Sequence, residues 1–271
     1  MTLCLGVLAW QWWQPKPVLV AIVHSQTGTM ASAERAVLQM TLAAIEQVNR
    51  QGGVLGRAVQ PIVLDGASDA QQFARVVDQV LNERELAVVF GGWTSASRRA
   101  MIPVIERHQS LLIYPVQYEG LENSQRVIYT GTTPNQQLNP ALTWMLEKFG
   151  KKVLLVGSDY IFPRVENDIA KVLLKRLDAQ VCGEYYIKLG TGHLEGLAQQ
   201  IEQCRPDFIL NTVNGYDNLP LLSLLRQEGA RTPIMSLSMD EQQLHQLIVA
   251  IGEGAAIAHY ASASYFSSDK Q

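Results

Sequence analysis

The sequence predicts an α/β protein in which strands and helices alternate to form two lobes, each built on a parallel sheet. Continuous apolar runs such as residues 18–23 (VLVAIV) are typical of strands that are covered on both faces. Helical spacing of apolar residues follows most of these runs, as over 32–49. The pattern restarts after Pro134, and such alternation favours parallel strands joined by right-handed crossovers.

In the first lobe, apolar runs that end at polar or glycine-containing turns predict strands at 18–23, 59–64, 86–90, 111–114 and 127–130. Apolar residues three to four apart predict helices at 32–49, 70–81 and 95–108. Gly52, Gly53 and Gly56 follow a helix rather than a strand, so they indicate a helix end and a turn instead of a dinucleotide-binding loop.

The second lobe repeats the order. Helices are expected at 139–149, 165–177, 194–204, 219–227 and 241–251, and strands at 152–156, 182–187, 208–212, 234–238 and 256–261. The turns GSDY and NG end two of these strands. We therefore divide the chain into a segment 1–17, an N-terminal lobe 18–137, a C-terminal lobe 138–262 and a returning segment 263–271.

Composition excludes several classes of protein. Of 271 residues, 47% are hydrophobic and 17% charged, with a formal net charge of −3, which argues against a nucleic-acid surface. Cys4, Cys182 and Cys204 are widely spaced and form no CxxC motif, so no zinc site or disulfide framework is predicted. A single bridge between Cys182 and Cys204 and two buried free thiols both remain open. No metal or cofactor is expected.

The N-terminus is apolar and rich in tryptophan over residues 3–13 (LCLGVLAWQWW). A membrane-spanning helix needs about 20 apolar residues, so this run is too short. It has no positively charged start and no obvious cleavage site. We interpret it as the remnant of an export signal or membrane anchor, with a tag-like tail as the alternative.

Two polar turns follow neighbouring strands, FGGWTSASR (90–98) and YPVQYEG (114–120). Side chains at the carboxyl ends of parallel strands converge in a crevice, and this set suits a small polar ligand. Its members are Trp93, Thr94, Ser95, Tyr114, Gln117, Tyr118 and Glu119. Thr94 or Ser95 either contacts the ligand or caps the helix that follows.

The second lobe offers a matching polar set at its own strand ends. Asp159 and Tyr160 follow the strand at 152–156, and Asp159 is either a ligand contact, a helix cap or a solvated carboxylate. Other polar residues expected to face the first lobe are Asn211, Asn214, Asp217, Ser236 and Ser238. Some of these must satisfy the backbone of turns instead.

Catalysis is not predicted. His24, Ser25 and Asp65 lie at the ends of the first two strands, but no GxSxG motif surrounds a serine. Adjacent residues of an extended strand point to opposite faces, so His24 and Ser25 are poorly placed as base and nucleophile.

Several motifs together resemble one family. They are HSQTGTMA (24–31), NRQGGVLG (49–56), DGASD (65–69), VVFGGWTSASR (88–98), YPVQYEG (114–120), YTGTTPNQQ (129–137), GSDYIFPR (157–164), NTVNG (211–215) and HYA…YF (259–266). The chain is similar to the urea and short-chain-amide substrate-binding proteins of ABC importers. These belong to the type I periplasmic-binding superfamily, related to branched-chain amino acid receptors and to the amidase-regulating amide sensor.

The resemblance implies two Rossmann-like lobes that close on a small amide like a flytrap. It implies that Ser95 and nearby backbone N–H groups donate to the ligand carbonyl, and that Glu119 or Gln117 accepts from its NH₂ groups. Tyr118 and Tyr160 would stack on the planar ligand. Carried over by motif, further residues at the cleft are Trp93, Thr94, Tyr114, Asp159, Asn214 and Ser238.

The chain departs from the family pattern at Tyr216, where an acidic residue is expected, and at Ala263, where a tryptophan is expected. Family members continue and return to complete the first lobe, so 263–271 is expected to begin that return. The predicted partners are a small polar ligand (urea, an amide or an amino acid), a membrane permease and, by analogy, a second copy of the chain. The predicted location is the periplasm. The alternative is the extracytoplasmic sensing domain of a signalling protein that uses the same cleft.

Overall fold

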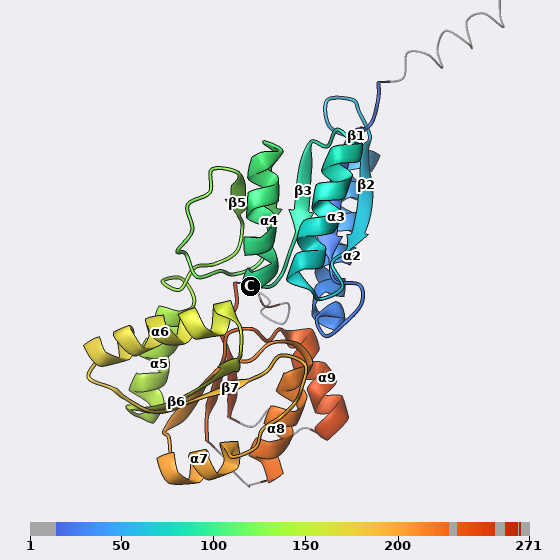
Figure 1. Ribbon diagram of the computed structural model, residues 1–271. Coiled ribbons are helices and arrows are strands. Elements are labelled where there is room, and N and C mark those ends of the chain that lie inside the picture. Colours follow the sequence, from blue (N-terminus) through green and yellow to red (C-terminus); the bar gives the residue numbers. More distant parts are fainter. Residues whose placement is uncertain (1–14, 228–231, 253–257, 265, 267–271) are drawn as a thin grey trace, which may run out of the picture.

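The computed structural model describes residues 15–227, 232–252, 258–264 and 266, and it contains two α/β units placed end to end (Figure 1). Most of the predicted N-terminal segment 1–17 and most of the predicted return 263–271 lie outside the described residues. The predicted domain boundaries stay predictions, although each sheet lies within one of the two predicted lobes.

The first unit holds a five-stranded sheet in the order β2-β1-β3-β4-β5, and all of its pairs are parallel. Because crossovers are right-handed, α2 lies on one face of this sheet and α3 and α4 on the other. The elements are β1 (Val18–His24), α2 (Ala31–Arg50), β2 (Val59–Asp65), α3 (Ala70–Glu83), β3 (Val88–Gly91), α4 (Ser95–Arg107), β4 (Leu112–Tyr114) and β5 (Val127–Tyr129).

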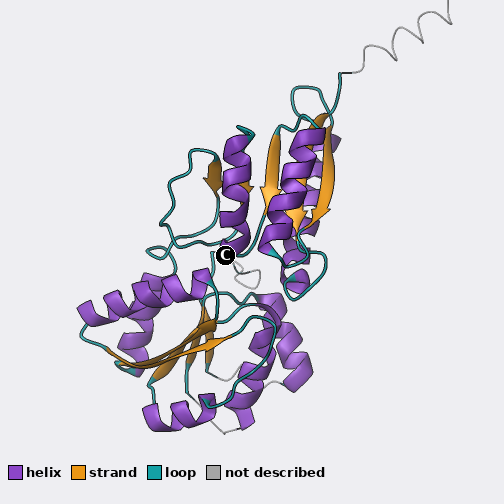
Figure 2. Ribbon diagram, viewed as in Figure 1, coloured by secondary structure: helices purple, strands orange, loops and turns teal. Residues whose placement is uncertain are grey.

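The second unit holds a parallel sheet in the order β10-β9-β8-β6-β7. By the same rule α6 covers one face, where α5 packs against it, and α7, α8 and α9 cover the other (Figure 2). The elements are α5 (Leu138–Phe149), β6 (Lys152–Ser158), α6 (Ile161–Arg176), β7 (Gln180–Ile187), α7 (Leu197–Cys204), β8 (Phe208–Thr212), a short 3₁₀ helix (Gly215–Asp217), α8 (Asn218–Gln227), β9 (Ile234–Ser236), α9 (Glu241–Ile251) and β10 (His259–Ala261).

The hydrophobic core is divided in the same way. In the first unit, Phe73 and Val77 of α3 pack with Met101 and Ile105 of α4 over the sheet. In the second unit both sheet faces carry a buried cluster, one under α5 and α6 and one under α7, α8 and α9. Strands β1, β6 and β8 are nearly all buried, as their continuous apolar sequences predict.

Several predicted boundaries shift. Helix α6 begins at Ile161 instead of 165, because Pro163 lies in the first turn, where its missing N–H is not needed. Helix α7 begins at Leu197 instead of 194, and β3 begins at Val88 instead of 86. Strand β10 begins at His259, and residues 256–257 of its predicted range, 256–261, lie outside the described residues.

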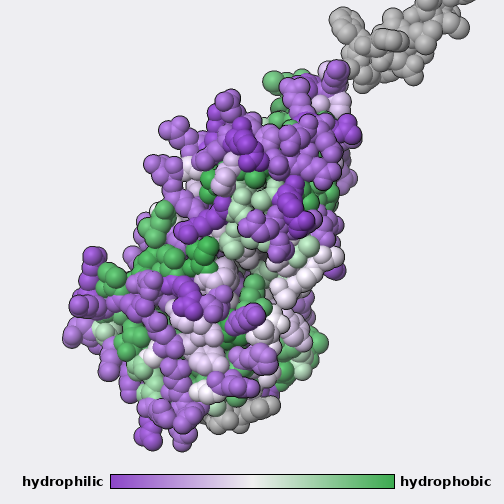
Figure 3. Space-filling view, viewed as in Figure 1, coloured by the Kyte–Doolittle hydropathy of each residue, from purple (hydrophilic) through white to green (hydrophobic). Residues whose placement is uncertain are grey.

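The parallel strands of the first sheet place their carboxyl ends at one edge. In Figure 1 the arrowheads of β2 and β3 point toward the second unit. The loops after β1, β3 and β4 therefore begin at this edge, including the two polar turns singled out from the sequence. In the space-filling view, apolar areas interrupt the mainly hydrophilic surface near the junction of the two units (Figure 3).

Cys182 of β7 and Cys204 at the end of α7 form a disulfide, which resolves the alternative left open by the sequence. Their Cα atoms are 5.6 Å apart, within the usual range for such a bridge. The bond ties the edge strand of the second sheet to a helix that covers it.

Gly91, at the end of β3, is a position where only glycine fits. It has a φ of +135°, and an added Cβ would lie 1.9 Å from the carbonyl oxygen of Val23 in β1. We predict that Gly91→Ala lowers the free energy of unfolding by about 2–4 kcal/mol. Gly52→Ala is the matched control, because Gly52 has a φ of +100° but nothing within 4 Å of the added atom. Gly52→Ala should lower the free energy of unfolding, measured with urea, by about 1 kcal/mol. Equal losses in the two variants would contradict the predicted clash.

Candidate functional site

A buried arginine organises the carboxyl edge of the first sheet. Arg98 of α4 is 0% exposed and is held by two carboxylates. Its Nη2 donates to Glu119 Oε2 at 2.8 Å, and its Nε donates to Glu122 Oε2 at 2.7 Å. Burial alone lowers the pKa of Arg98, but its hydrogen bonds to Glu122 and Glu119 and the charges of Tyr114 and Glu119 outweigh it and raise the pKa above its usual value. The guanidinium is therefore charged and fixed.

Glu119 lies at the centre of this cluster with one oxygen occupied and one free. Ser95 Oγ donates to Glu119 Oε2 at 2.9 Å, and this is the same oxygen that Arg98 holds. Glu119 is 2% exposed. Its second oxygen, Oε1, is buried and has no hydrogen-bond partner among the residues that the structure describes. Because a buried acceptor without a donor is costly, this atom marks a place where a ligand N–H or O–H would be stabilised.

Aromatic rings surround the guanidinium. Arg98 lies over the ring of Tyr114 at 4.8 Å and over that of Tyr118 at 5.4 Å. Tyr118 stacks on Tyr129 with ring centres 4.0 Å apart, and Tyr129 OH donates to Glu122 Oε2 at 3.0 Å. Tyr114 OH donates to the carbonyl oxygen of Trp93, and burial raises the pKa of Tyr114. These rings pack around Arg98, whose ion pair with Glu119 is buried, and Tyr114 connects the two predicted turns.

The second unit contributes Tyr160 and Glu166 to the same region. Tyr160 precedes α6, and although its side chain as a whole is partly exposed, its phenol oxygen is enclosed. Burial raises the pKa of Tyr160 well above its usual value, and the nearby Tyr114 and Glu119 of the first unit raise it further. Glu166 is 3% exposed, and α6, on which it lies, packs against α4. The cluster is therefore shared by both units.

A cavity of about 210 Å³ lies between the units. Glu119 does not line it, and Trp93, whose carbonyl oxygen accepts from Tyr114, connects it to the cluster. Trp93 and Gln117 line it from the first unit, and Leu237 and Ser238 line it from the second. Gln117 Nε2 lies 3.3 Å from both the Leu237 carbonyl oxygen and Ser238 Oγ. Gln137, at the crossover, donates to the same carbonyl at 2.8 Å. Amide groups of the first unit thus hold the second unit at the cavity.

Other predicted site residues have partners elsewhere. Thr94 caps α4 by accepting from the Ser97 backbone N–H at 3.1 Å. Asp159 is exposed and accepts from Arg164 Nε at 2.7 Å. Asn214 is buried and donates to the Thr212 carbonyl at 3.1 Å. The structure brings Trp93, Ser95, Tyr114, Gln117, Tyr118, Glu119, Tyr160 and Ser238 to the junction of the units.

Three members of the second unit's predicted polar set, Asn211, Asp217 and Ser236, make contacts within that unit. Asp217 accepts from the backbone N–H groups of Gly190 and Gly192 at 2.6 and 2.9 Å. Asn211 Nδ2 contacts Ser236 Oγ at 2.9 Å. These contacts agree with the alternative that some polar residues satisfy turns. They leave Ser238 as the member that lines the cavity.

The His24, Ser25 and Asp65 set does not form a catalytic arrangement. His24 Nδ1 faces Glu34 Oε2 at 3.1 Å rather than Asp65. Asp65 accepts from the Gln26 backbone N–H and from Thr27 Oγ1, which lie in the loop after β1. Ser25 Oγ accepts from the Ser68 backbone N–H at 2.9 Å. The serine and histidine side chains therefore serve separate contacts.

Sequence reasoning missed the charged residues that complete this junction, namely Glu34, Arg98, Glu122 and Glu166. A signal exists for Arg98 alone: it follows Ser95 by three residues, which places both on the same face of α4. Glu34 and Glu166 can be recognised as members of the junction only from the packing of the helices in the structure.

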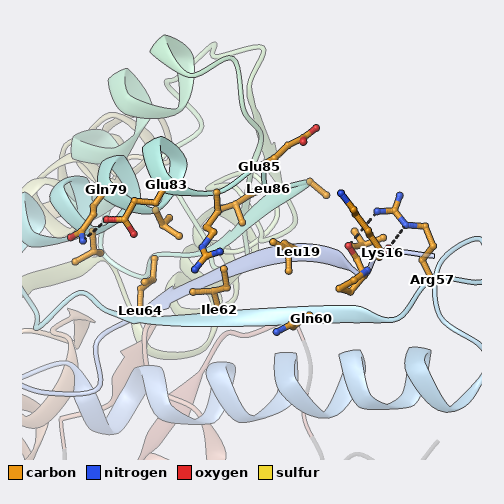
Figure 4. Close-up of a pocket in the computed structure, with 16 residues that line it drawn as sticks. Lys16, Leu19, Arg57, Gln60, Ile62, Leu64, Gln79, Glu83, Glu85 and Leu86 are labelled. Carbon is orange, nitrogen blue, oxygen red and sulfur yellow. Dashed lines mark hydrogen bonds between the residues drawn. The ribbon is translucent and has the colours of Figure 1, made fainter. Parts of the chain in front are cut away.

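A larger hollow lies elsewhere, on the first sheet, with a volume of about 1000 Å³ (Figure 4). Leu19 of β1 and Ile62 and Leu64 of the edge strand β2 form its floor, and Gln79 and Glu83 of α3 border it. It runs along the strands, whereas ligand sites of parallel sheets lie beyond the strand ends. We therefore interpret it as an uncovered part of the sheet face.

Within the described ranges, no cluster of three or more histidine, cysteine or acidic residues is arranged to hold a metal ion. None of the described helices combines the length and apolar character needed to cross a bilayer.

The chain matches the family model described as periplasmic binding protein domain over residues 18–271, and it belongs to that family. Proteins of this family bind ligands without transforming them, in agreement with the non-catalytic prediction. A leucine-, isoleucine-, valine-, threonine- and alanine-binding protein of Pseudomonas aeruginosa is 31% identical over 98 residues. The aligned region is 36% of this chain and 26% of that protein.

Solved structures show the same fold. A fatty acid ABC transporter substrate-binding protein from Thermomonospora curvata matches with a TM-score of 0.80 at 21% identity, over 91% of this chain and 63% of that one. The substrate-binding protein LivJ of Streptococcus pneumoniae, in complex with isoleucine, matches with a TM-score of 0.80 at 15% identity, over 90% and 70%. An R. palustris solute-binding protein in complex with benzoate matches with a TM-score of 0.80 at 16% identity, over 94% and 70%.

These likenesses confirm the predicted α/β type I periplasmic-binding fold with two parallel sheets. The chain spans less than two thirds of the T. curvata protein, and about a quarter of the curated relative is aligned. None of these four relatives is described as binding urea or an amide, so that ligand stays a prediction.

Glu166 gives a pH-dependent prediction. Burial, followed by the negative charge of Glu119, raises its pKa from 4.5 to about 8. Between these pH values Glu166 retains a proton in the folded protein that the unfolded chain has lost. The contribution of Glu166 to the free energy of unfolding is therefore greatest at low pH and falls as pH rises. Glu166→Gln holds no such proton. Its advantage over the original protein should therefore grow by about 1.4 kcal/mol per pH unit between about pH 5 and pH 8.

Urea unfolding at several pH values measures this advantage. Glu202→Gln is the control, because Glu202 is exposed on α7, and its effect should be the same at every pH. A constant difference between Glu166→Gln and the original protein would show that Glu166 is charged in the folded state.

Proposed function

We propose that this protein is a solute-binding protein of an ABC importer and that it holds a small polar solute with N–H donors, such as urea, a short-chain amide or an amino acid, between its two units. Glu119 Oε1 carries the proposal, because it is a buried acceptor without a donor at the carboxyl edge of the first sheet. Membership of the periplasmic binding protein family supports the binding role.

The charge of the site supports a donor at this position. Arg98 engages only Oε2 of Glu119, and Ser95 shares that oxygen. A solute NH₂ or ammonium group would therefore complete the hydrogen bonding of Oε1. A solute carboxylate at the same place would face a carboxylate and be repelled. In this arrangement Ser95 orients Glu119 instead of donating to a ligand carbonyl, which changes the role that the resemblance implies for it.

The remaining contacts favour a small solute. The cavity between the units is about 210 Å³, below the usual range for drug-sized ligands of roughly 300–1,000 Å³. Gln117 and Ser238 offer amide and hydroxyl groups to a polar solute. Tyr160 approaches from the second unit and would cover one side of it. Trp93 would form a wall of the solute site, and Tyr114 and Tyr118 would support it by packing around Arg98.

The periplasm is the proposed location, and a membrane permease is the proposed partner. The Cys182–Cys204 disulfide supports this location, because disulfides persist in oxidising compartments. The family description also names the periplasm. The anchor proposed for residues 1–17 would keep the protein beside the permease.

A thermal-shift screen tests the proposal, using urea, acetamide, aliphatic amino acids and benzoate. A solute at 100 times its Kd stabilises the folded state by about 2.7 kcal/mol if it binds that state alone. At least one N–H-bearing solute should raise the melting temperature, and no ammonia should be released from urea or acetamide. Ammonia release would overturn the non-catalytic assignment, and the absence of any shift would overturn the proposed solute class.

We predict that Glu119→Gln lowers the affinity for the best N–H-bearing solute at least tenfold. The amide can keep its oxygen on Arg98 and Ser95, which places an NH₂ group where Oε1 accepts in the original protein. Glu147→Gln is the control, because Glu147 is exposed on α5. Isothermal titration calorimetry gives the affinities. Unchanged binding by a folded Glu119→Gln protein would exclude Glu119 as the solute contact.

A further inference from the structure

His24 is a second buried side chain at the carboxyl edge of the first sheet. It is the last residue of β1, where it pairs with Asp65 of β2, and it is 1% exposed. The preceding residue, Val23, pairs with Gly91 of β3. Gly91 and Gly92 carry no side chain between His24 and the turn that holds Trp93. Strand β1 is therefore next to the strand whose turn holds Trp93, and β4, whose loop carries Glu119, is the next strand along.

Glu34 fixes the orientation of the His24 ring. Glu34 Oε2 lies 3.1 Å from His24 Nδ1 and accepts from the Ser25 backbone N–H at 2.8 Å. Glu34 is itself 1% exposed, on the first turn of α2. Since a carboxylate only accepts hydrogen bonds, Nδ1 is the nitrogen that carries the proton. In the tautomer with its proton on Nδ1, the ring presents a lone pair at Nε2.

His24 Nε2 is buried and has no partner within the described part of the chain, as is also true of Glu119 Oε1. Glu34, which contacts His24, and Glu119 act electrostatically on the same two phenols. Burial raises the pKa of both Tyr114 and Tyr160, and the charges of Glu119 and Glu34 each raise it further. Both carboxylates therefore lie near the same two phenols, one from each unit.

We propose that His24 is a second solute-contact residue, whose Nε2 accepts a hydrogen bond from the same nitrogen-bearing end of the solute that Glu119 Oε1 holds. Glu34 is the positioning residue that holds Nδ1 as the donor and so directs Nε2 to act as the acceptor. The inference rests on the proposed function. It deepens that function by requiring a nitrogen with at least two hydrogens, as in a primary amide, urea or an ammonium group.

Selectivity follows from the pair of acceptors. A solute with two N–H donors satisfies both buried atoms, whereas an analogue without them leaves both unsatisfied and is rejected. Carboxylic acids that lack nitrogen are therefore poor ligands. The imidazole is an acceptor here and takes part in no bond-breaking step.

Calorimetry with matched solutes tests the inference. The pairs are leucine with 4-methylpentanoate and acetamide with N,N-dimethylacetamide, in which the second member lacks the N–H donors. We expect His24→Phe to weaken binding of the first members about tenfold to a hundredfold and to leave the second members unchanged. His245→Phe, an exposed position on α9, should bind as the original protein does. Unchanged affinity of a folded His24→Phe protein overturns the inference.

Two further measurements keep the test valid if His24→Phe does not fold. His24→Gln keeps an acceptor oxygen near the place of Nε2 and should retain more affinity than Glu119→Gln. In nitrogen NMR of histidine-labelled protein, the Nε2 resonance of His24 should move when the N–H-bearing solute is added, while Nδ1 stays protonated. In Glu34→Leu the two tautomers of His24 should mix before solute is added. If the nitrogen resonances of His24 change neither on addition of the solute nor in the Glu34→Leu variant, the inference is overturned.

The outcomes separate the two proposals. If Glu119→Gln loses binding and His24→Phe does not, His24 is no solute contact and the proposed function stands. If neither variant changes the binding of a solute that stabilises the protein, the solute lies elsewhere and both proposals fail.

Discussion

The buried ion pair between Arg98 and Glu119 is the interaction on which the candidate site depends. A charged group that is fully removed from water must be paired and hydrogen-bonded, and Arg98 meets this demand with Glu119, Glu122 and the rings of Tyr114 and Tyr118. Removing one partner of such a pair typically costs about 3–5 kcal/mol, because the other charge stays buried. The same contacts fix Glu119 so that Oε2 is occupied and Oε1 is available.

The second unit completes this environment. Tyr160 precedes α6 and Glu166 lies on it, and this helix packs against α4 of the first unit. Their hydroxyl and carboxyl groups enclose a region that already holds Glu34 and Glu119, so the local polarity depends on contact between the units. A solute donor placed there would relieve acceptors of the first unit while touching the second. This gives a physical reason for a solute to stabilise contact between the two units.

Much of the fold is predictable from the sequence, because continuous apolar strands and helical spacing are local signals, and most boundaries fall within three residues. The turns at Trp93–Ser95 and Tyr114–Glu119 are predictable as a meeting point because parallel strands end at one edge. The roles of the individual residues in these turns are not predictable from the sequence. The sequence predicts that Tyr118 stacks on the ligand, but it stacks on Tyr129. Ser95 donates its hydroxyl hydrogen to Glu119 instead of to a ligand. Arg98 and Glu166 read as surface charges until helix packing buries them.

A crystal structure of the protein with the most stabilising N–H-bearing solute tests the central claim most directly. The account predicts that Arg98 and Ser95 stay on Glu119 Oε2 while a nitrogen of the solute lies within hydrogen-bond distance of Glu119 Oε1, with Tyr160 on its other side. A solute bound between the units with Glu119 Oε1 unengaged, or one bound in the hollow along β2, would contradict it.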